Sequence, residues 1–265
     1  MPIVLKLTIL FITICAQLSF TSKPADAEDL HLYQANSSKF ETLEIDYYYQ
    51  KKTWKNYIGK INALVIDVNA DLNHVFRSRI KIPLDIVLLT NETIEKKFNL
   101  PKWVNAFYHR EQIYISINDS KPLILEKIRK TIKHELAHAY IFKLSNGQSP
   151  VWLDEGLAKL LEDKNCKIEL VKIKNWLKKN KILPAKQINQ SFTLLSHHKS
   201  KVAYAQSKLM MKYLLNISST ESLRAYLEAL KAGKRNAFKE SFAIDQLDFF
   251  RNFSHWVRHQ AIKPT

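Results

Sequence analysis

His134-Glu135-Leu136-Ala137-His138 is the stretch of this sequence that decides the fold around it. On a helix, residues four apart lie above one another on one face, so His134 and His138 can bind a single metal ion. Glu135 lies about 100° round the helix from His134 and can stand beside that ion without binding it. Because neither Gly nor Pro interrupts the run around this motif, we predict a helix near 123–144.

A second stretch, WLDEGLA at 152–158, follows after a short loop. Ser149 and Pro150 form a helix start signal, with Ser149 as the cap and Pro150 in the first helical position. The loop between the two stretches would turn the chain back and lay the two helices side by side. Glu155 then becomes a candidate for the third ligand of the same ion.

Two imidazoles and one carboxylate are a common donor set of catalytic zinc, and they leave the fourth position to water. Bound zinc lowers the pKa of that water to roughly 7, and Glu135 can take the proton as general base. An HExxH motif alone arises by chance in about one chain in a hundred of this length. The prediction of one zinc ion on His134, His138 and Glu155 therefore depends on the two stretches together.

These motifs resemble those of the gluzincins, the zinc peptidases of the thermolysin clan, and most of all the peptidase MA-like proteins. The likeness covers about residues 84–216, with the sharp motifs confined to 134–158. It implies that the two histidines and Glu155 are the ligands and that Glu135 is the base.

The chain departs from the clan in two ways. The GAMEN-type motif of the aminopeptidase branch is absent, which argues against a related aminopeptidase. Thermolysin-like enzymes place an Asp four residues after the third ligand to orient a histidine, whereas this chain has Lys159 there. Another group must orient the imidazole, and Asp154 is a candidate.

The segment Asn105-Ala106-Phe107-Tyr108 resembles the start of the edge strand that holds the substrate in thermolysin-like enzymes. Alternating isoleucines at 113–117 predict a half-buried strand there, which we take as the edge strand. An edge strand has free backbone groups that can pair with an extended peptide. The resemblance implies that Asn105 and Ala106 bind the substrate backbone; chance agreement of a short motif is the alternative.

Tyr204 is a candidate donor to the oxyanion that forms during peptide hydrolysis, because the clan places a Tyr on a later helix for this purpose. The alternative is a tyrosine that only packs on an amphipathic helix. His197 and His198 lie nearby in the sequence and are expected to be exposed loop residues.

The N-terminus has the pattern of a secretory leader. An apolar run follows Lys6, and Ala25-Asp26-Ala27 resembles a cleavage site, so we predict a signal peptide over 1–27 and an exported, periplasmic or secreted protein. The alternative is an uncleaved leader that tethers the protein to the membrane. Cleavage would leave Cys166 as the single cysteine, which excludes an internal disulfide.

The formal net charge of +16 falls to +15 when residues 1–27 are removed. A basic surface favours anionic partners, and we expect weak association with an anionic envelope surface. No signature of a nucleic-acid-binding fold is present, so no nucleic-acid partner is predicted. Four glycines in the whole chain are too few for a loop that cradles phosphates. The lysines between 164 and 186 are interpreted as a solvated helical face.

The predicted fold class is α+β, in a domain spanning 28–265. A small mixed N-terminal lobe (about 46–145), with an antiparallel edge strand, and a mostly helical C-terminal lobe (about 146–265) would flank the metal cleft. We expect helix from about 46 to 80 and strand at 82–89. Further helices are expected near 150–163, 167–179, 201–216, 219–231 and 245–260, and residues 28–45 are taken as a short N-terminus of uncertain order.

The predicted function is zinc-dependent hydrolysis of peptide or protein substrates. One alternative is a non-catalytic exported binding protein with a structural metal site that docks on an anionic envelope. Another is a basic envelope-binding protein without a metal. The pattern does not predict side-chain preference, endo- or exopeptidase action, or oligomeric state.

Overall fold

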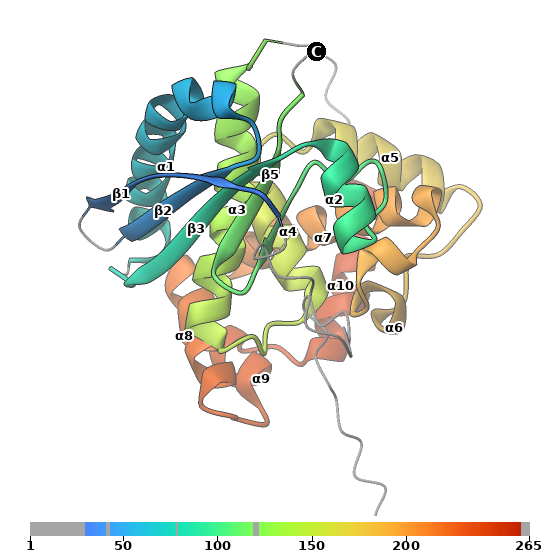
Figure 1. Cartoon of the computed structure of the whole chain (residues 1–265). Coiled ribbons are helices and arrows are strands. Elements are labelled where there is room, and N and C mark those ends of the chain that lie inside the picture. The colour runs from blue at the N-terminus through green and yellow to red at the C-terminus, as the bar shows by residue number, and fades with distance from the viewer. Residues whose placement is uncertain (1–29, 41–42, 78, 119–121, 261–265) are drawn as a thin grey trace, which may run out of the picture.

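The computed structural model describes residues 30–40, 43–77, 79–118 and 122–260, and the predicted leader at 1–27 lies outside them. Five strands form one open sheet with the order β1-β2-β3-β5-β4 (Figure 1). Their bounds are β1 Tyr33–Phe40, β2 Leu43–Tyr49, β3 Ile82–Leu89, β4 Ala106–His109 and β5 Gln112–Ser116.

The sheet mixes parallel and antiparallel pairs. β3 runs parallel to both β2 and β5, whereas β1 and β4 pair antiparallel at the two edges. The expected edge strand at 113–117 is therefore wrong, because β5 lies inside the sheet, and β4 takes the edge position beside it. Ile113 and Ile115 are buried because they pack in the larger hydrophobic cluster, which includes residues of α1 (Lys55–Phe76) and α3 (Leu125–Ser145).

The expectation of helix from about 46 is also wrong at its start. Residues 43–49 form β2, in which buried and partly exposed side chains alternate along the whole strand. This period of two is the mark of a strand with one face on the core. Helix α1 (Lys55–Phe76) begins only after a short 3-10 turn at Lys52–Trp54. Residues 33–40, taken as a terminus of uncertain order, form β1.

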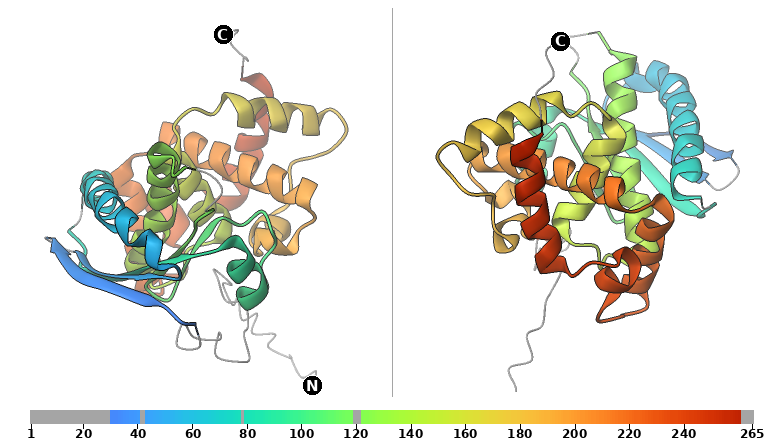
Figure 2. Two further views of the ribbon diagram at one scale, coloured as in Figure 1. Left: turned by 45° about the horizontal axis from the view of Figure 1, so that its top comes forward. Right: turned by 180° about the vertical axis from the view of Figure 1, so that it is seen from behind.

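Helices cover both faces of the sheet. α1 and α3 (Leu125–Ser145) pack against each other and lie on one face of the sheet (Figure 2). α2 (Asn91–Phe98) covers the other face with a smaller cluster, in which Ile94 and Phe98 contact Val87, Leu89 and Tyr114. α3 therefore runs between the sheet and the helical half of the molecule.

The rest of the chain is almost wholly helical. The helices are α4 Val151–Glu162, α5 Lys167–Leu177, α6 Ala185–Ile188, α7 His197–Ile217, α8 Thr220–Lys231, α9 Ala237–Phe242 and α10 Gln246–His259. All five helices predicted after residue 150 are present, and the α+β class is confirmed. α2, α6 and α9 were not predicted. α7 begins at His197, so His197 and His198 lie in its first turn and not in a loop.

The start of α4 differs from the predicted cap. Pro150 is itself the N-cap residue, with extended backbone angles and no side-chain hydrogen bond to the helix, so Ser149 is not the cap. The backbone carbonyl of Pro150 instead accepts from the N–H groups of Leu153 and Asp154, at 2.9 and 3.1 Å. Proline suits this end because the first helical N–H groups have no intrahelical partner.

One hydrophobic cluster joins the sheet to the helical half. It runs from β2 and β3 through α1 and α3 into α4, α7 and α10, with Trp54, Trp152 and Phe249 among its largest buried side chains. Residues of both α3 and α4 belong to this shared core, in which the two helices pack against each other. Within the described residues, no helix combines the length and apolar composition needed to cross a membrane.

Candidate metal centre

Helices α3 and α4 bring together the three predicted ligands. The Nε2 atoms of His134 and His138 lie 3.2 Å apart. The Oε2 atom of Glu155 lies 3.6 Å from Nε2 of His134 and 3.8 Å from Nε2 of His138. Among the described residues, only these three side chains form a group of potential metal ligands. Their donor atoms lie within 4.8 Å of one another.

The donor set fits a zinc ion. In a tetrahedral site with bonds of about 2.0–2.1 Å, neighbouring ligand atoms lie roughly 3.3 Å apart, close to the three separations found here. Oε2 of Glu155 is buried without a hydrogen-bond partner within the described part of the chain. A buried carboxylate oxygen is costly to leave unpaired, and a cation among the three atoms would satisfy it.

Asp154 orients His138. Its Oδ1 atom lies 2.7 Å from Nδ1 of His138, so the imidazole turns Nε2 toward the metal position. Burial acts to lower the pKa of His138, but the carboxylates of Asp154, Glu155 and Glu135 raise it to about 10. The contact that the predicted orienting role of Asp154 requires is therefore present at this histidine.

Glu162 faces Nδ1 of His134 as an ion-pair partner without the hydrogen-bond geometry seen at His138, and the sequence had not pointed to it. Its Oε2 atom lies 3.2 Å from Nδ1 of His134 and accepts a hydrogen bond of 2.6 Å from Lys159. Burial acts to raise the pKa of Glu162, but His134 and Lys159 hold it at about 2. Lys159 thus stands where the clan has an orienting Asp, and the carboxylate comes from the next turn of α4.

Glu135 lies beside the three ligands with its side chain buried at 6% exposure. Burial raises its pKa, with a further contribution from Glu155, while the two imidazoles act in the opposite direction. Burial thus makes this carboxylate more basic than an exposed glutamate. It is not among the three residues whose donor atoms converge.

These residues line a cleft of about 1270 Å³ between β4 and helices α3, α4, α5 and α7. Tyr204 of α7 also lines it, with its ring edge-on to Phe192 and Nζ of Lys159 5.8 Å from the ring centre. Burial raises the pKa of Tyr204 well above its ordinary value, and nearby carboxylates including Glu155 add to the shift. The hydroxyl therefore stays protonated and can donate.

The edge strand β4 forms one wall of the same cleft. The carbonyl of Asn105 accepts from the N–H of Ser116 at 2.8 Å, and its side chain donates to the carbonyl of Trp103. Hydrogen-bonded and open positions alternate along an antiparallel pair. Ala106 and Tyr108 therefore present their backbone groups to the free edge, whereas Asn105 uses its carbonyl inside the sheet. Tyr108 was missed in the sequence, although the alternation could have indicated it once the edge strand was known.

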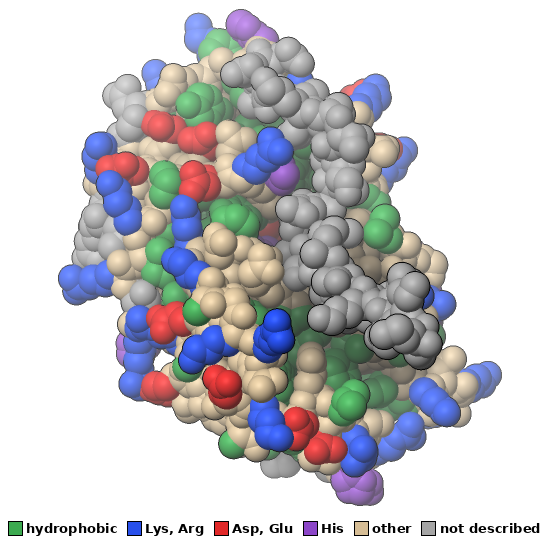
Figure 3. Space-filling view, turned by 90° about the horizontal axis from the view of Figure 1, so that it is seen from below, with side chains coloured by type: hydrophobic (Ala, Val, Ile, Leu, Met, Phe, Trp, Pro, Cys, Tyr) green, Lys and Arg blue, Asp and Glu red, His purple; other side chains and the backbone are tan. Residues whose placement is uncertain are grey.

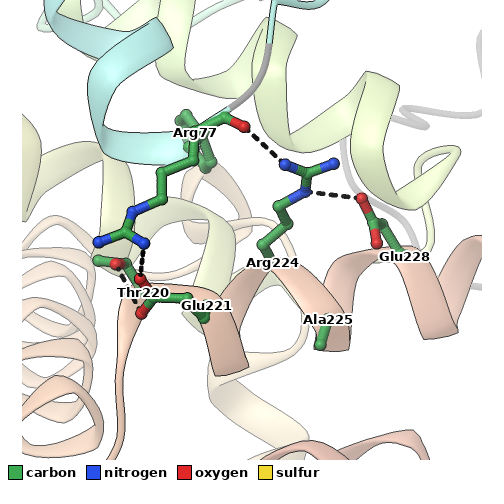
Figure 4. Close-up of a pocket in the computed structure, with 7 residues that line it drawn as sticks. Arg77, Thr220, Glu221, Arg224, Ala225 and Glu228 are labelled. Carbon is green, nitrogen blue, oxygen red and sulfur yellow. Dashed lines mark hydrogen bonds and ion pairs between the residues drawn. The ribbon is translucent and has the colours of Figure 1, made fainter.

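A second, smaller pocket of about 270 Å³ lies away from this cleft, between the end of α1 and α8 (Figure 4). Its two arginines already have partners. Arg77 pairs with Glu221 at 2.5 Å, while Arg224 bonds Glu228 and the carbonyl of Arg77 at 2.7 and 2.6 Å. The polar side chains that line this pocket therefore join the end of α1 to α8.

Comparison with known families agrees with this geometry. Residues 67–259 match the sequence profile of the peptidase MA superfamily. The match covers most of the chain, so the protein belongs to this superfamily, as the resemblance of its two motifs predicted. No curated protein matches the sequence.

Proposed function

We propose that the protein is a zinc-dependent peptidase that hydrolyses peptide bonds in peptides or proteins. The observation that carries the proposal is the buried Oε2 of Glu155, which has no hydrogen-bond partner among the described residues and faces two imidazole Nε2 atoms beside the buried carboxylate of Glu135. Membership of the peptidase MA superfamily supports it. A zinc ion held by His134, His138 and Glu155 would polarise the scissile carbonyl and acidify a water molecule.

The chain's own residues would then do the following. The substrate backbone pairs in extended form with the free edge of β4, through the backbone groups of Ala106 and Tyr108. Glu135 accepts the proton of the attacking water and holds it for the leaving amine. Tyr204 donates its hydroxyl hydrogen to the oxyanion that forms from the carbonyl.

A non-catalytic binding protein with a structural metal site is the second candidate. A structural zinc site usually fills all four positions with protein ligands, whereas three are gathered here. A base beside the ligands serves no purpose in such a site, so Glu135 favours the enzyme. We also propose that the protein acts after export, with cleavage behind Ala27, and that it associates weakly with anionic envelope surfaces.

The test uses the chain from residue 28 onward, purified and analysed for metal, then digested with a broad peptide library. We expect one zinc ion per chain and cleavage that a chelator abolishes and added zinc restores. Stoichiometric zinc with no cleavage of any peptide would favour the binding protein. A preparation that binds no zinc would refute both the zinc peptidase and the binding protein with a structural metal site.

Replacement of Glu162 is expected to weaken zinc binding. Glu162→Gln keeps the shape of the side chain but removes the charge facing Nδ1 of His134, so zinc affinity should fall about tenfold. Glu169→Gln is the matched control, because Glu169 lines the same cleft but bonds Lys208. Zinc affinity is measured by competition with a chromogenic chelator. Equal affinities for the two variants would show that Glu162 does not position His134.

A further inference from the structure

Four lysines line the cleft, from helices α3, α5 and α7, and we call this set the lysine end: Lys127, Lys130, Lys172 and Lys201. Within the described residues, no carboxylate lies within 4.0 Å of the Nζ atoms of Lys127, Lys172 or Lys201. Lys130 has only the exposed Glu126, at 3.9 Å. Within the described part of the chain, these positive charges are therefore largely unneutralised.

The acidic side chains in this part of the cleft already have partners. Glu162 faces His134 and Lys159. Glu169 pairs with Lys208 at 3.3 Å. Asp163 accepts a hydrogen bond of 2.8 Å from the N–H of Asn165. None of these carboxylates is paired with a member of the lysine end.

Each member of the lysine end lies within two helical turns of another residue that lines the cleft. Lys130 and Lys127 precede His134 by one and two turns of α3, which places them roughly 6 and 10 Å from it along the helix axis. Lys201 precedes Tyr204 by about one turn of α7, and Lys172 follows Glu169 by one turn of α5. An extended peptide advances about 3.3 Å per residue, so its side chains two to four residues from the scissile bond would reach these lysines.

We infer that the preferred substrates are peptide segments with acidic side chains two to four residues from the scissile bond, on the side of the lysine end. The inference rests on the proposed function, since it assigns a substrate class to the same cleft. Acidic side chains would form ion pairs with the four ammonium groups, and a peptide is favoured as the occupant because the edge of β4 runs along the same cleft.

Basic charge is not confined to the cleft. Lys and Arg side chains are spread over the face in Figure 3, with fewer acidic side chains among them. A general positive field would attract any anion, so the experiment must hold the net charge constant. The matched control replaces four exposed lysines that do not line the cleft and have no ion pair within the described residues: Lys55, Lys60, Lys178 and Lys231.

Two fluorescent peptides are compared that differ only in Glu or Gln at the positions facing the lysine end. Binding is measured with zinc-loaded Glu135→Gln protein, so that cleavage does not interfere. We expect the Glu peptide to bind about tenfold more tightly, because several exposed ion pairs add small gains. Replacing all four cleft lysines with Gln should remove the difference, whereas the four control replacements should keep it. Raising the salt concentration should weaken only the Glu peptide.

Three outcomes would overturn the inference. The Glu and Gln peptides could bind equally to the parent protein. The control and cleft variants could lose the preference equally, which would assign it to net charge. Vesicles of anionic lipid could bind through the four cleft lysines while the peptides are not distinguished, which would make the lysine end a lipid site. Preferential binding of the Glu peptide without cleavage by the wild type would refute the proposed hydrolysis and leave this recognition in place.

Discussion

Replacement of Glu135 by Gln is expected to lower kcat for peptide hydrolysis by about a thousandfold while zinc binding stays unchanged. Gln has nearly the same shape but cannot accept a proton, and a positioned general base contributes roughly 10²- to 10⁴-fold to the rate. Glu135 is separate from the three converging ligands, so the ion should remain. The rate is measured on a peptide that the wild type cleaves, with zinc content determined on the same preparation.

Glu126→Gln is the control for this experiment, because it removes a carboxylate from the exposed first turn of the same helix. It should leave both kcat and zinc content unchanged. Cleavage by Glu135→Gln at more than about a tenth of the wild-type rate would mean that another group takes the proton. Loss of zinc from Glu135→Gln would mean that this carboxylate helps to bind the ion.

The metal centre was predictable because its spacing is local. His134 and His138 are four residues apart on one helix, and the next helix follows after a short loop and packs beside the first. This arrangement restricts Glu155 to positions close to the two histidines. Asp154 could be named as an orienting group for the same reason. The predicted helices after residue 150 also follow from uninterrupted helical periodicity in this half of the chain.

The orientation of His134 was not predictable from local spacing. Glu162 lies two turns beyond Glu155, and its approach to His134 depends on the crossing of α3 and α4, which the shared core sets. Strand β2 was missed for a different reason: its three consecutive tyrosines fit either a strand or a helix when they are taken singly. Pairing with β1 and β3 resolves the ambiguity, and pairing is a non-local property.

The assignment of the edge strand failed on the same ground. Alternation at 113–117 indicates that a strand has one buried face, but it does not indicate which strand lies outermost in the sheet. The short hairpin places β4 outside β5, so β4 supplies the free edge that faces the cleft. The predicted substrate-binding residue Ala106 lies on this free edge, and Tyr108 takes the place of Asn105 in the proposed pairing with substrate.

Gly156 shows a further constraint on the motif that holds Glu155. A Cβ atom at this position would lie 2.3 Å from the carbonyl oxygen of Ser207 and 2.7 Å from its carbonyl carbon. Those atoms belong to the backbone of α7, so relief requires separation of α4 from α7 and not a change of side-chain rotamer. The glycine thus permits the close contact that keeps Glu155 and Tyr204 on facing walls of one cleft.

Gly156→Ala is expected to destabilise the protein by about 3 kcal/mol, at the upper end of overpacking costs, and to weaken zinc binding because α4 carries a ligand. Gly59→Ala is the matched control, since Gly59 lies within α1 and an added Cβ there has no atom within 4 Å. Alanine in that helix should raise the free energy of unfolding by about 0.5–1 kcal/mol. Both values are measured by urea denaturation. Both substitutions share the gain in helix propensity. Opposite signs of the two changes in unfolding free energy would therefore assign the destabilisation to the contact between α4 and α7, whereas stabilisation of both variants would refute this constraint at Gly156.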